Sequence, residues 1–290
     1  MTLSLAHAPV QTAPTLSLRV ACAKGEKAIS FIAEQYATYP FRLSGNLRLD
    51  PSDPQRVYAY IMNASPGILS GDDLRLAVQV GDRASLYLTD QSATKVHSRP
   101  ANGATARMTY SIQVGAGSYL EYVPEPIILF TAAALTQNMQ ILLHPQGRLV
   151  LSEIIVPGRL AKGEFYDFEE FQSRLQVETP ARKRCFADNF RLFGQSNRFQ
   201  HSLFLTKWPI MGNFVVIVPG IRLNDLSQAL QNYPHCPDEL LVGDSPLPGC
   251  HGLLVRAIAT HVSLLKDYQR HLLNCVRQIS GNAPLPPIPK

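Results

Sequence analysis

The chain has 290 residues, of which 46% are hydrophobic and 17% charged, the composition of a globular protein able to bury an ample core. Its net charge of +5 is small, and the one dense basic run, ARKR at 181–184, lacks the aromatic residues and motifs of a nucleic-acid site. The five cysteines are scattered without a C-x-x-C motif, which favours a reduced, cytoplasmic protein over a disulfide-rich secreted one.

The first strand-like unit follows a short N-terminal segment. Residues 1–13 carry neither a basic stretch nor a continuous apolar run, so we expect a flexible N-terminus without a secretory signal. Residues 16–33 (LSLRVACAKGEKAISFIA) alternate between apolar and polar side chains on both sides of a turn at Lys24-Gly25. This pattern predicts two strands joined by that turn.

Three further units of the same kind occupy the middle of the chain. In each unit, apolar side chains alternate with polar ones before and after a glycine-containing turn. The units are Leu74–Leu88, Met108–Tyr122 and Met139–Leu151. Their turns recur about every 32–34 residues, which predicts a mainly β fold of stacked antiparallel hairpins or sheets in a β-helix-like, layered body.

Helices are predicted only towards the C-terminus. Residues 222–233 offer Asn224 or Asp225 as an N-cap, and residues 261–279 place apolar side chains at helical spacing after a buried strand at 252–260. The proline-rich tail, 280–290, is predicted to be disordered. No shift in composition divides residues 14–279, so we expect one domain. The apolar stretch at 126–135 is about half as long as a membrane span, so we expect no membrane partner.

Ser92 and Lys95 have the S-x-x-K spacing by which a lysine activates a serine nucleophile in penicillin-binding hydrolases. A functional serine of this kind begins a helix, whereas the residues before Ser92 (ASLYLTD) are typical of a strand. The companion S-D-N and K-T-G motifs are missing, as are a G-x-S-x-G elbow and a P-loop. A serine hydrolase is therefore an alternative that the sequence disfavours.

Acidic residues gather where the predicted strands enter or leave their turns: Asp72, Asp73, Glu121, Glu125, Glu153 and Glu164. If the repeats stack, these carboxylates converge along an edge or an interior channel, with His97 near, and such ligands suit a divalent cation. For any single acid, a solvated turn residue is the simpler interpretation. Paired carboxylates would also suit a β-solenoid carbohydrate-active enzyme, although the single Trp argues against a sugar cleft.

A mirrored pair of dipeptides, His235-Cys236 and Cys250-His251, offers the ligand types of a tetrahedral zinc site. Adjacent residues of a strand point to opposite faces, so all four converge only on irregular backbone. Separate surface or packing roles are the simpler interpretation, and metal binding by these residues stays an open alternative.

Four longer strings occur in a fixed order: MNASPGILSGDDL (62–74), LTDQSATKVH (88–97), LEYVPEP (120–126) and EIIVPGRLAKGE (153–164). In these strings the chain resembles the UreD (also called UreH) family of urease accessory proteins. Shorter similarities, such as PFRL at 40–43 and the closing GLLVRAIA with its helix, extend the resemblance over nearly the whole chain.

The resemblance implies a non-catalytic, cytoplasmic scaffold and chaperone of nickel metallocentre assembly with a β-rich fold. It further implies that the chain binds apo-urease and UreF, and that UreF recruits the GTPase UreG. Transient Ni²⁺ would then pass through an internal tunnel towards the urease active site, with no tightly bound cofactor.

The resemblance also implies roles for particular residues. Candidates for tunnel-lining or transient nickel contacts are Asp72, Glu121, Glu153, Glu125 and Glu164. Candidates for shaping the tunnel wall or docking a partner are Asp73, Gln91, Ser92, Lys95, His97 and Arg159.

Overall fold

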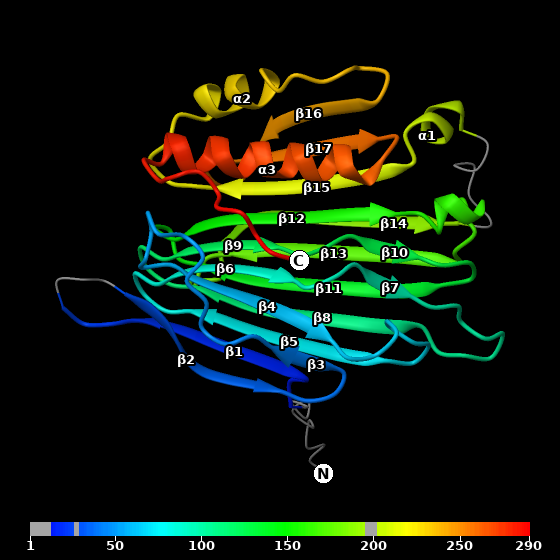
Figure 1. Cartoon of the computed structure of the whole chain (residues 1–290), viewed down its shortest axis with the longest axis horizontal. Coiled ribbons are helices and arrows are strands. Elements are labelled where there is room, and N and C mark those ends of the chain that lie inside the picture. Colours follow the sequence, from blue (N-terminus) through cyan, green and yellow to red (C-terminus); the bar gives the residue numbers. More distant parts are fainter. Residues whose placement is uncertain (1–12, 26–28, 195–201) are drawn as a thin grey trace, which may run out of the picture.

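The computed structural model describes residues 13–25, 29–194 and 202–290. The predicted flexible N-terminus lies outside these ranges except for its last residue. Among the described residues, two β-sheets of seven and ten strands form most of the molecule, and three α-helices accompany them (Figure 1). The prediction of a mainly β, layered fold with helices near the C-terminus is confirmed.

Sheet A, the seven-stranded sheet, has the spatial order β14 (Arg184–Phe193), β13 (Glu170–Glu178), β11 (Ala134–Leu143), β8 (Ala106–Val114), β5 (Asp73–Val80), β1 (Leu16–Cys22), β2 (Ser30–Ala37). Sheet B has the order β16 (Leu240–Pro246), β17 (Gly252–Ala259), β15 (Ile210–Ile217), β12 (Arg148–Val156), β9 (Tyr119–Val123), β6 (Ser85–Asp90), β4 (Val57–Asn63), β3 (Phe41–Leu43). Two short strands, β10 (Ile127–Leu129) and β7 (Thr94–Val96), pair with each other, and β10 also pairs with β12.

The strands of the three middle units lie where the alternation predicts them, but they are not hairpins. The two strands of each unit belong to opposite sheets, and equivalent strands of successive units pair in parallel: β5 with β8, β8 with β11, β6 with β9, and β9 with β12. Alternation specifies which side chains face the core but not which strand is the hydrogen-bonded neighbour. Each unit is therefore a β-arch whose two apolar faces oppose each other across the core. Only the first unit, β1 with β2, is an antiparallel hairpin as predicted.

The arches stack closely at their turns, and glycine makes this stacking feasible. The backbone N–H of Gly115 donates to the carbonyl of Val80 in the preceding arch at 2.9 Å. A Cβ at Gly115 would lie 2.5 Å from Oδ1 and 2.8 Å from the backbone nitrogen of Asp82. The recurring glycines that reveal the repeat in the sequence thus have a steric role where one turn lies on the next.

Two hydrophobic cores follow from this arrangement. The larger one lies between the sheets and takes alternate residues of every arch strand, such as Leu86 and Leu88 of β6. The second lies on the outer face of sheet B, beneath α2 (Leu223–Gln231) and α3 (Val262–Ile279). Both predicted helices are confirmed. The short helix α1 (Leu203–Lys207) and the 3-10 helix η1 (Leu160–Lys162) were not predicted from the sequence.

The tail differs from its prediction. Residues 280–290 form neither helix nor strand, but they pack along the outer face of sheet B. Leu285 is only 9% exposed, its backbone N–H donates to the side chain of Asn274, and the carbonyl of Pro289 accepts a hydrogen bond from Tyr60. Composition alone suggested disorder because the prolines exclude regular structure, yet the few apolar residues between them suffice to hold the tail.

Candidate functional site

A cavity of about 50 Å³ lies between the two sheets. Strands of both sheets contribute to its wall, which is mostly apolar and includes Met108, Tyr110, Tyr122, Met139 and Leu175. Four acidic residues also line it: Asp90, Glu125, Glu153 and Asp188. The volume holds about three or four water molecules. The space between the sheets is therefore neither solid nor purely apolar.

Glu153 of β12 lines this cavity because it shares its strand face with Leu149, Leu151 and Ile155, all part of the inter-sheet core. Three neutral side chains hold its carboxylate: Gln137 of β11 at 2.5 Å, Ser173 of β13 at 3.1 Å and Asn213 of β15 at 3.3 Å.

Burial raises the pKa of Glu153, and the three hydrogen bonds lower it only in part. Within the part of the chain that the structure describes, no Lys or Arg pairs with this carboxylate. Glu153 is thus a buried acid held by neutral donors, with room beside it for a cation.

Asp90, at the end of β6, is one of two acids of the cavity wall, with Asp188, that were not predicted from the sequence. It alternates with Leu86 and Leu88, so it faces the space between the sheets, and burial raises its pKa to about 7. A second cavity, of about 60 Å³, shares Asp90 and Thr94 with the first and reaches Ser92 and Lys95. Asp90 therefore stands between the interior cavity and a hollow lined by the residues of the LTDQSATKVH string.

Asp188 of β14 stands at another boundary of the cavity. Both of its carboxylate oxygens accept hydrogen bonds from Arg256 of β17 at 2.9 Å. This ion pair joins β14, an edge strand of sheet A, to sheet B, and half of the Arg256 side chain is exposed. The spacing of Phe186, Asp188 and Phe190 in the sequence marks Asp188 as inward-facing.

Glu121, predicted to line the tunnel, lies on the other face of sheet B. It alternates with Leu120 and Tyr122, which face the inter-sheet core, so its side chain points towards α3. Arg277 of α3 contacts it at 2.8 Å through Nε, and Arg56 contacts it at 2.9 Å. Burial alone would raise the pKa of Glu121, but the two arginine charges outweigh it and lower the pKa. Glu121 is a structural anchor and does not line the cavity.

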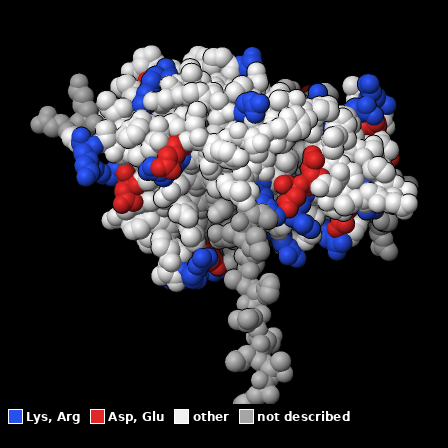
Figure 2. All heavy atoms as spheres, turned by 90° about the horizontal axis from the view of Figure 1, so that it is seen from below, with Lys and Arg blue, Asp and Glu red and all other residues white. Residues whose placement is uncertain are grey.

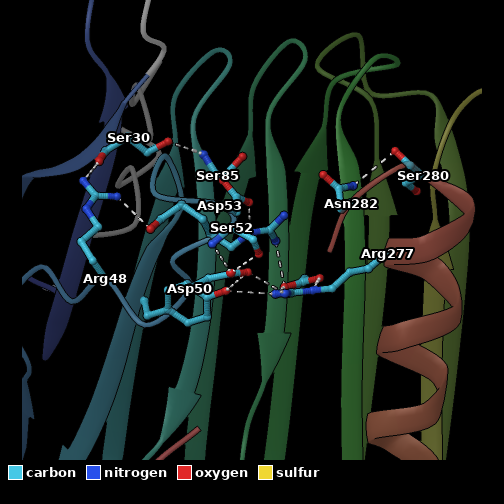
Figure 3. Close-up of polar contacts among 12 residues, drawn as sticks. Ser30, Arg48, Asp50, Ser52, Asp53, Ser85, Arg277, Ser280 and Asn282 are labelled. Atoms are coloured by element: carbon cyan, nitrogen blue, oxygen red, sulfur yellow. Dashed lines mark hydrogen bonds and ion pairs between the residues drawn. The ribbon is translucent and has the colours of Figure 1, made fainter. Parts of the chain in front are cut away.

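Figure 3 shows the surroundings of this anchor. Arg277 extends from α3 towards Asp50, with 3.7 Å between Nη1 and Oδ2, and Asp50 also accepts a hydrogen bond from the backbone of Ser52. Arg48 donates hydrogen bonds to the carbonyls of Ser30, in β2, and of Arg56, directly before β4. The network fixes the C-terminal helix against β4, β9 and the 50–53 loop.

Glu125 does line the cavity, but it is already paired. Lys266 of α3 contacts Oε2 at 2.8 Å and Lys290 of the tail contacts Oε1 at 3.0 Å. Burial tends to raise the pKa of Glu125, and these two ammonium groups reverse the effect and lower it.

The other predicted acids lie away from the cavity. Asp72 is a turn residue whose carboxylate accepts the backbone N–H of Leu69 at 2.8 Å, and Asp73 pairs with Arg75 at 2.6 Å. Glu164 accepts from Nε of Arg159 at 2.9 Å, and this contact lowers the pKa of Glu164 to about 2. These acids do not converge with Glu153, because the turns that carry them lie at the ends of the arches.

Arg159 also stacks on Phe130, with its guanidinium carbon 4.5 Å from the ring centre. His97 meets the same ring edge-on at 5.1 Å and contacts the carbonyl of Pro66 at 3.1 Å. Two of the predicted wall or docking residues, Arg159 and His97, therefore share one aromatic neighbour at one end of the arches.

The S-x-x-K serine lacks the framework of a hydrolase. Ser92 is exposed in a bend, and Lys95 lies in strand β7, so no helix relates the two residues. Gln91 is exposed in the same bend. A sugar ring is larger than a cavity for about three or four waters, so the cavity also disfavours the carbohydrate-active alternative.

The mirrored His and Cys pairs do not form a metal cage. His235 contacts the carbonyl of Tyr233 at 2.7 Å, and His251 contacts that of Ile221 at 2.6 Å. In residues 13–25, 29–194 and 202–290, no group of three or more His, Cys, Asp or Glu side chains is placed to hold a metal ion. The acids of the cavity lie along its wall rather than around one point.

The basic run noted in the sequence lies on the surface of the protein. The run at 181–184 is solvent-exposed, and its Arg182 lies 3.4 Å from Glu178. On the face drawn in Figure 2, the described Lys and Arg side chains form small groups close to Asp and Glu, and most of that face is uncharged. No helix in the described ranges is long and apolar enough to cross a bilayer.

The fold and site together define a class: a β-arch sandwich with an acid-lined interior cavity. Comparison with known proteins then gives the family. The family model described as UreD urease accessory protein matches residues 12–290. The chain belongs to the UreD urease accessory protein family, as its four sequence strings predict.

Curated relatives share this name. The UreD urease accessory protein of Trichodesmium erythraeum is 43% identical over 277 residues, covering 95% of this chain and 98% of that protein. The UreD urease accessory protein of Haloarcula marismortui is 34% identical over 227 residues, covering 78% of this chain and 74% of that protein. Membership in this family supports a role in urease maturation.

Proposed function

We propose that this protein is a non-catalytic scaffold that carries Ni²⁺, as cargo, towards the active site of apo-urease through the space between its two sheets. Its partners in this proposal are apo-urease, UreF and, through UreF, the GTPase UreG, all in the cytoplasm. The chain itself holds no nucleotide-binding motif, so GTP hydrolysis is the task of the partner.

Glu153 is the observation that carries the proposal. A conduit needs ligands that bind a divalent cation weakly enough to release it, and a single carboxylate with neutral neighbours meets this need better than a thiolate cage. Glu153 contacts Gln137, Ser173 and Asn213, whose oxygen atoms are further hard ligands within reach of the same cavity.

Asp90 and Asp188 extend the acidic path. Asp90 borders both cavities, and Asp188 borders the interior cavity on β14, an edge strand of sheet A. We infer that the ion passes from one of these boundaries to the other by way of Glu153. Asp72, Glu121 and Glu164 have no place on this path, because their carboxylates are held elsewhere.

Reconstitution with purified components tests the proposal. Apo-urease, UreF, UreG, GTP, Ni²⁺ and bicarbonate are mixed with and without this protein, and urease activity is measured over time. We expect activation to depend on the protein. Equal activation in both mixtures would defeat the proposal.

A further inference from the structure

The C-terminal tail ends beside the acidic cavity. It leaves α3, crosses the outer face of sheet B and reaches the end of β6 (Figure 1). Leu285 and Ile288 pack against the outer core, and Tyr60 donates a hydrogen bond to the carbonyl of Pro289 at 2.8 Å. These contacts hold the side chain of Lys290 at a fixed place on sheet B.

Sheet B has a break at that place. The ladder between β6 and β9 ends at Thr89 and Val123, and pairing resumes only where Thr94 of β7 meets Ile127 of β10. Residues 90–93 and 124–126 separate the two ladders, and these include Asp90 and Glu125, both of which line the interior cavity. The break therefore lies between the cavity and the outer face of the sheet.

The ammonium of Lys290 covers this break from outside. It contacts Glu125 Oε1 at 3.0 Å and donates to Thr89 Oγ1 at 2.8 Å and to the carbonyl of Asp90 at 2.5 Å. The Glu125 side chain is only 12% exposed, whereas that of Lys290 is 28% exposed. The partly exposed Lys290 therefore pairs with Glu125 of the cavity wall, which also pairs with Lys266.

We propose that Lys290 is a tethered cationic plug, and that a divalent cation reaches Glu125 through the break in sheet B only when the tail is displaced. The lysine charge and a divalent cation compete for the same carboxylate, so release of the tail would open a lateral port into the cavity. This inference rests on the proposed function for the identity of the cation, but the competition itself is a property of the isolated chain.

Nickel binding to the purified full-length protein tests the plug. Isothermal titration with Ni²⁺ at low ionic strength is performed on the wild type and on Lys290→Gln. Loss of one charge at ion-pair distance on this partly exposed site should tighten Ni²⁺ binding by about three- to tenfold. Lys290→Arg keeps the charge and should behave as the wild type. Adding Glu125→Gln to Lys290→Gln should abolish the gain.

Lys162→Gln is the matched control, because it removes the same charge from an exposed site on η1. Unchanged binding in Lys290→Gln, or an equal gain in Lys162→Gln, would overturn the plug. Thermal unfolding of each variant shows whether it is folded. If Lys290→Gln gains affinity while reconstitution needs no added protein, the plug stands and the proposed function fails. If binding is unchanged while activation depends on the protein, only the plug fails.

Discussion

Glu153 combines two properties at the scale of single residues: it is buried among apolar side chains, and its hydrogen-bond partners are all neutral. A buried carboxylate with a cationic partner, such as Glu121, is already neutralised and gains little from a passing ion. Glu153 lacks that partner in the described structure, so a divalent cation would relieve its unfavourable burial.

Glu153→Gln keeps the size and most hydrogen bonds of the side chain but removes its charge. We expect urease activation in the reconstituted system to fall by about tenfold, while UreF and urease still bind the protein. Glu239→Gln, at an exposed position, is the control for loss of one negative charge and should activate normally. Normal activation by Glu153→Gln would remove this residue from the path.

Asp90 makes stability depend on pH. Its pKa is about 7 in the folded chain against an ordinary value of 3.8, so between these values the folded chain binds the proton more strongly than the unfolded chain. The stabilisation that protonation gives is therefore lost as pH rises through this window.

Asp90→Asn removes that titration. The free energy of unfolding of the variant minus that of the wild type should be about 1–4 kcal/mol larger at pH 8 than at pH 4. Urea unfolding at the two pH values gives both free energies. A difference between variant and wild type that is independent of pH would show that Asp90 does not titrate in this window.

An acid that stands at the same alternate positions of a strand as the core residues can be predicted from the sequence to face inward. Leu149, Leu151 and Glu153 stand at alternate positions, so the sequence already indicates an inward-facing acid, and Leu86, Leu88 and Asp90 have the same pattern. Glu121 stands between Leu120 and Tyr122, so the same alternation predicts that it faces away from the inter-sheet core. The arginines that hold Glu121 come from 65 and 156 residues away, and no local pattern reveals them.

At the scale of secondary-structure elements, the β-arch is the repeating unit of the fold. The strand positions follow from alternation and glycine turns, whereas the partner of each strand depends on whether the turn bends within a sheet or crosses between sheets. Hydrogen bonds between successive turns, such as Gly115 to Val80, stabilise the crossing arrangement only after the arches have stacked. The local sequence pattern therefore does not predict which strands are hydrogen-bonded neighbours.

Gly115→Ala should disturb this stacking. The added methyl would lie 2.5 Å from Asp82 Oδ1 and 2.8 Å from the Asp82 backbone nitrogen, and we expect a destabilisation of about 1–3 kcal/mol. Gly243→Ala is the matched control, since a Cβ there meets no atom within 4 Å. Urea unfolding compares the two variants; equal stabilities would contradict the proposed steric role of the glycine.

The anchor of α3 gives another prediction at this scale. Arg277→Met leaves Glu121 buried with Arg56 as its remaining arginine partner, and breaking such a buried pair costs about 3–5 kcal/mol. Arg191→Met removes an exposed pair with Glu170 and should cost less than about 1 kcal/mol. Chemical denaturation distinguishes these values. Similar losses in both variants would mean that the buried network does not anchor the helix.

At the scale of the whole molecule, the cavity between the two sheets is bordered by charged residues at three places. Asp90 adjoins the hollow lined by Ser92 and Lys95, Asp188 pairs with the half-exposed Arg256 at the edge of sheet A, and Lys290 covers a break in sheet B. Family membership could be predicted from the strings, because they extend over a long part of the chain. The lining of the interior cavity could not, since it depends on side chains from eleven strands meeting across the core.

The central claim is that Ni²⁺ passes between the sheets, and obstruction of the cavity tests it most directly. Ser173→Leu fills the space beside Glu153, whereas Ser111→Leu makes the same change on an exposed strand position outside the cavity. With folding and partner binding verified for both variants, urease activation is measured in the reconstituted system. We predict that Ser173→Leu loses most of the activation and that Ser111→Leu retains it. Equal activation by the two variants would contradict passage of the ion through this interior.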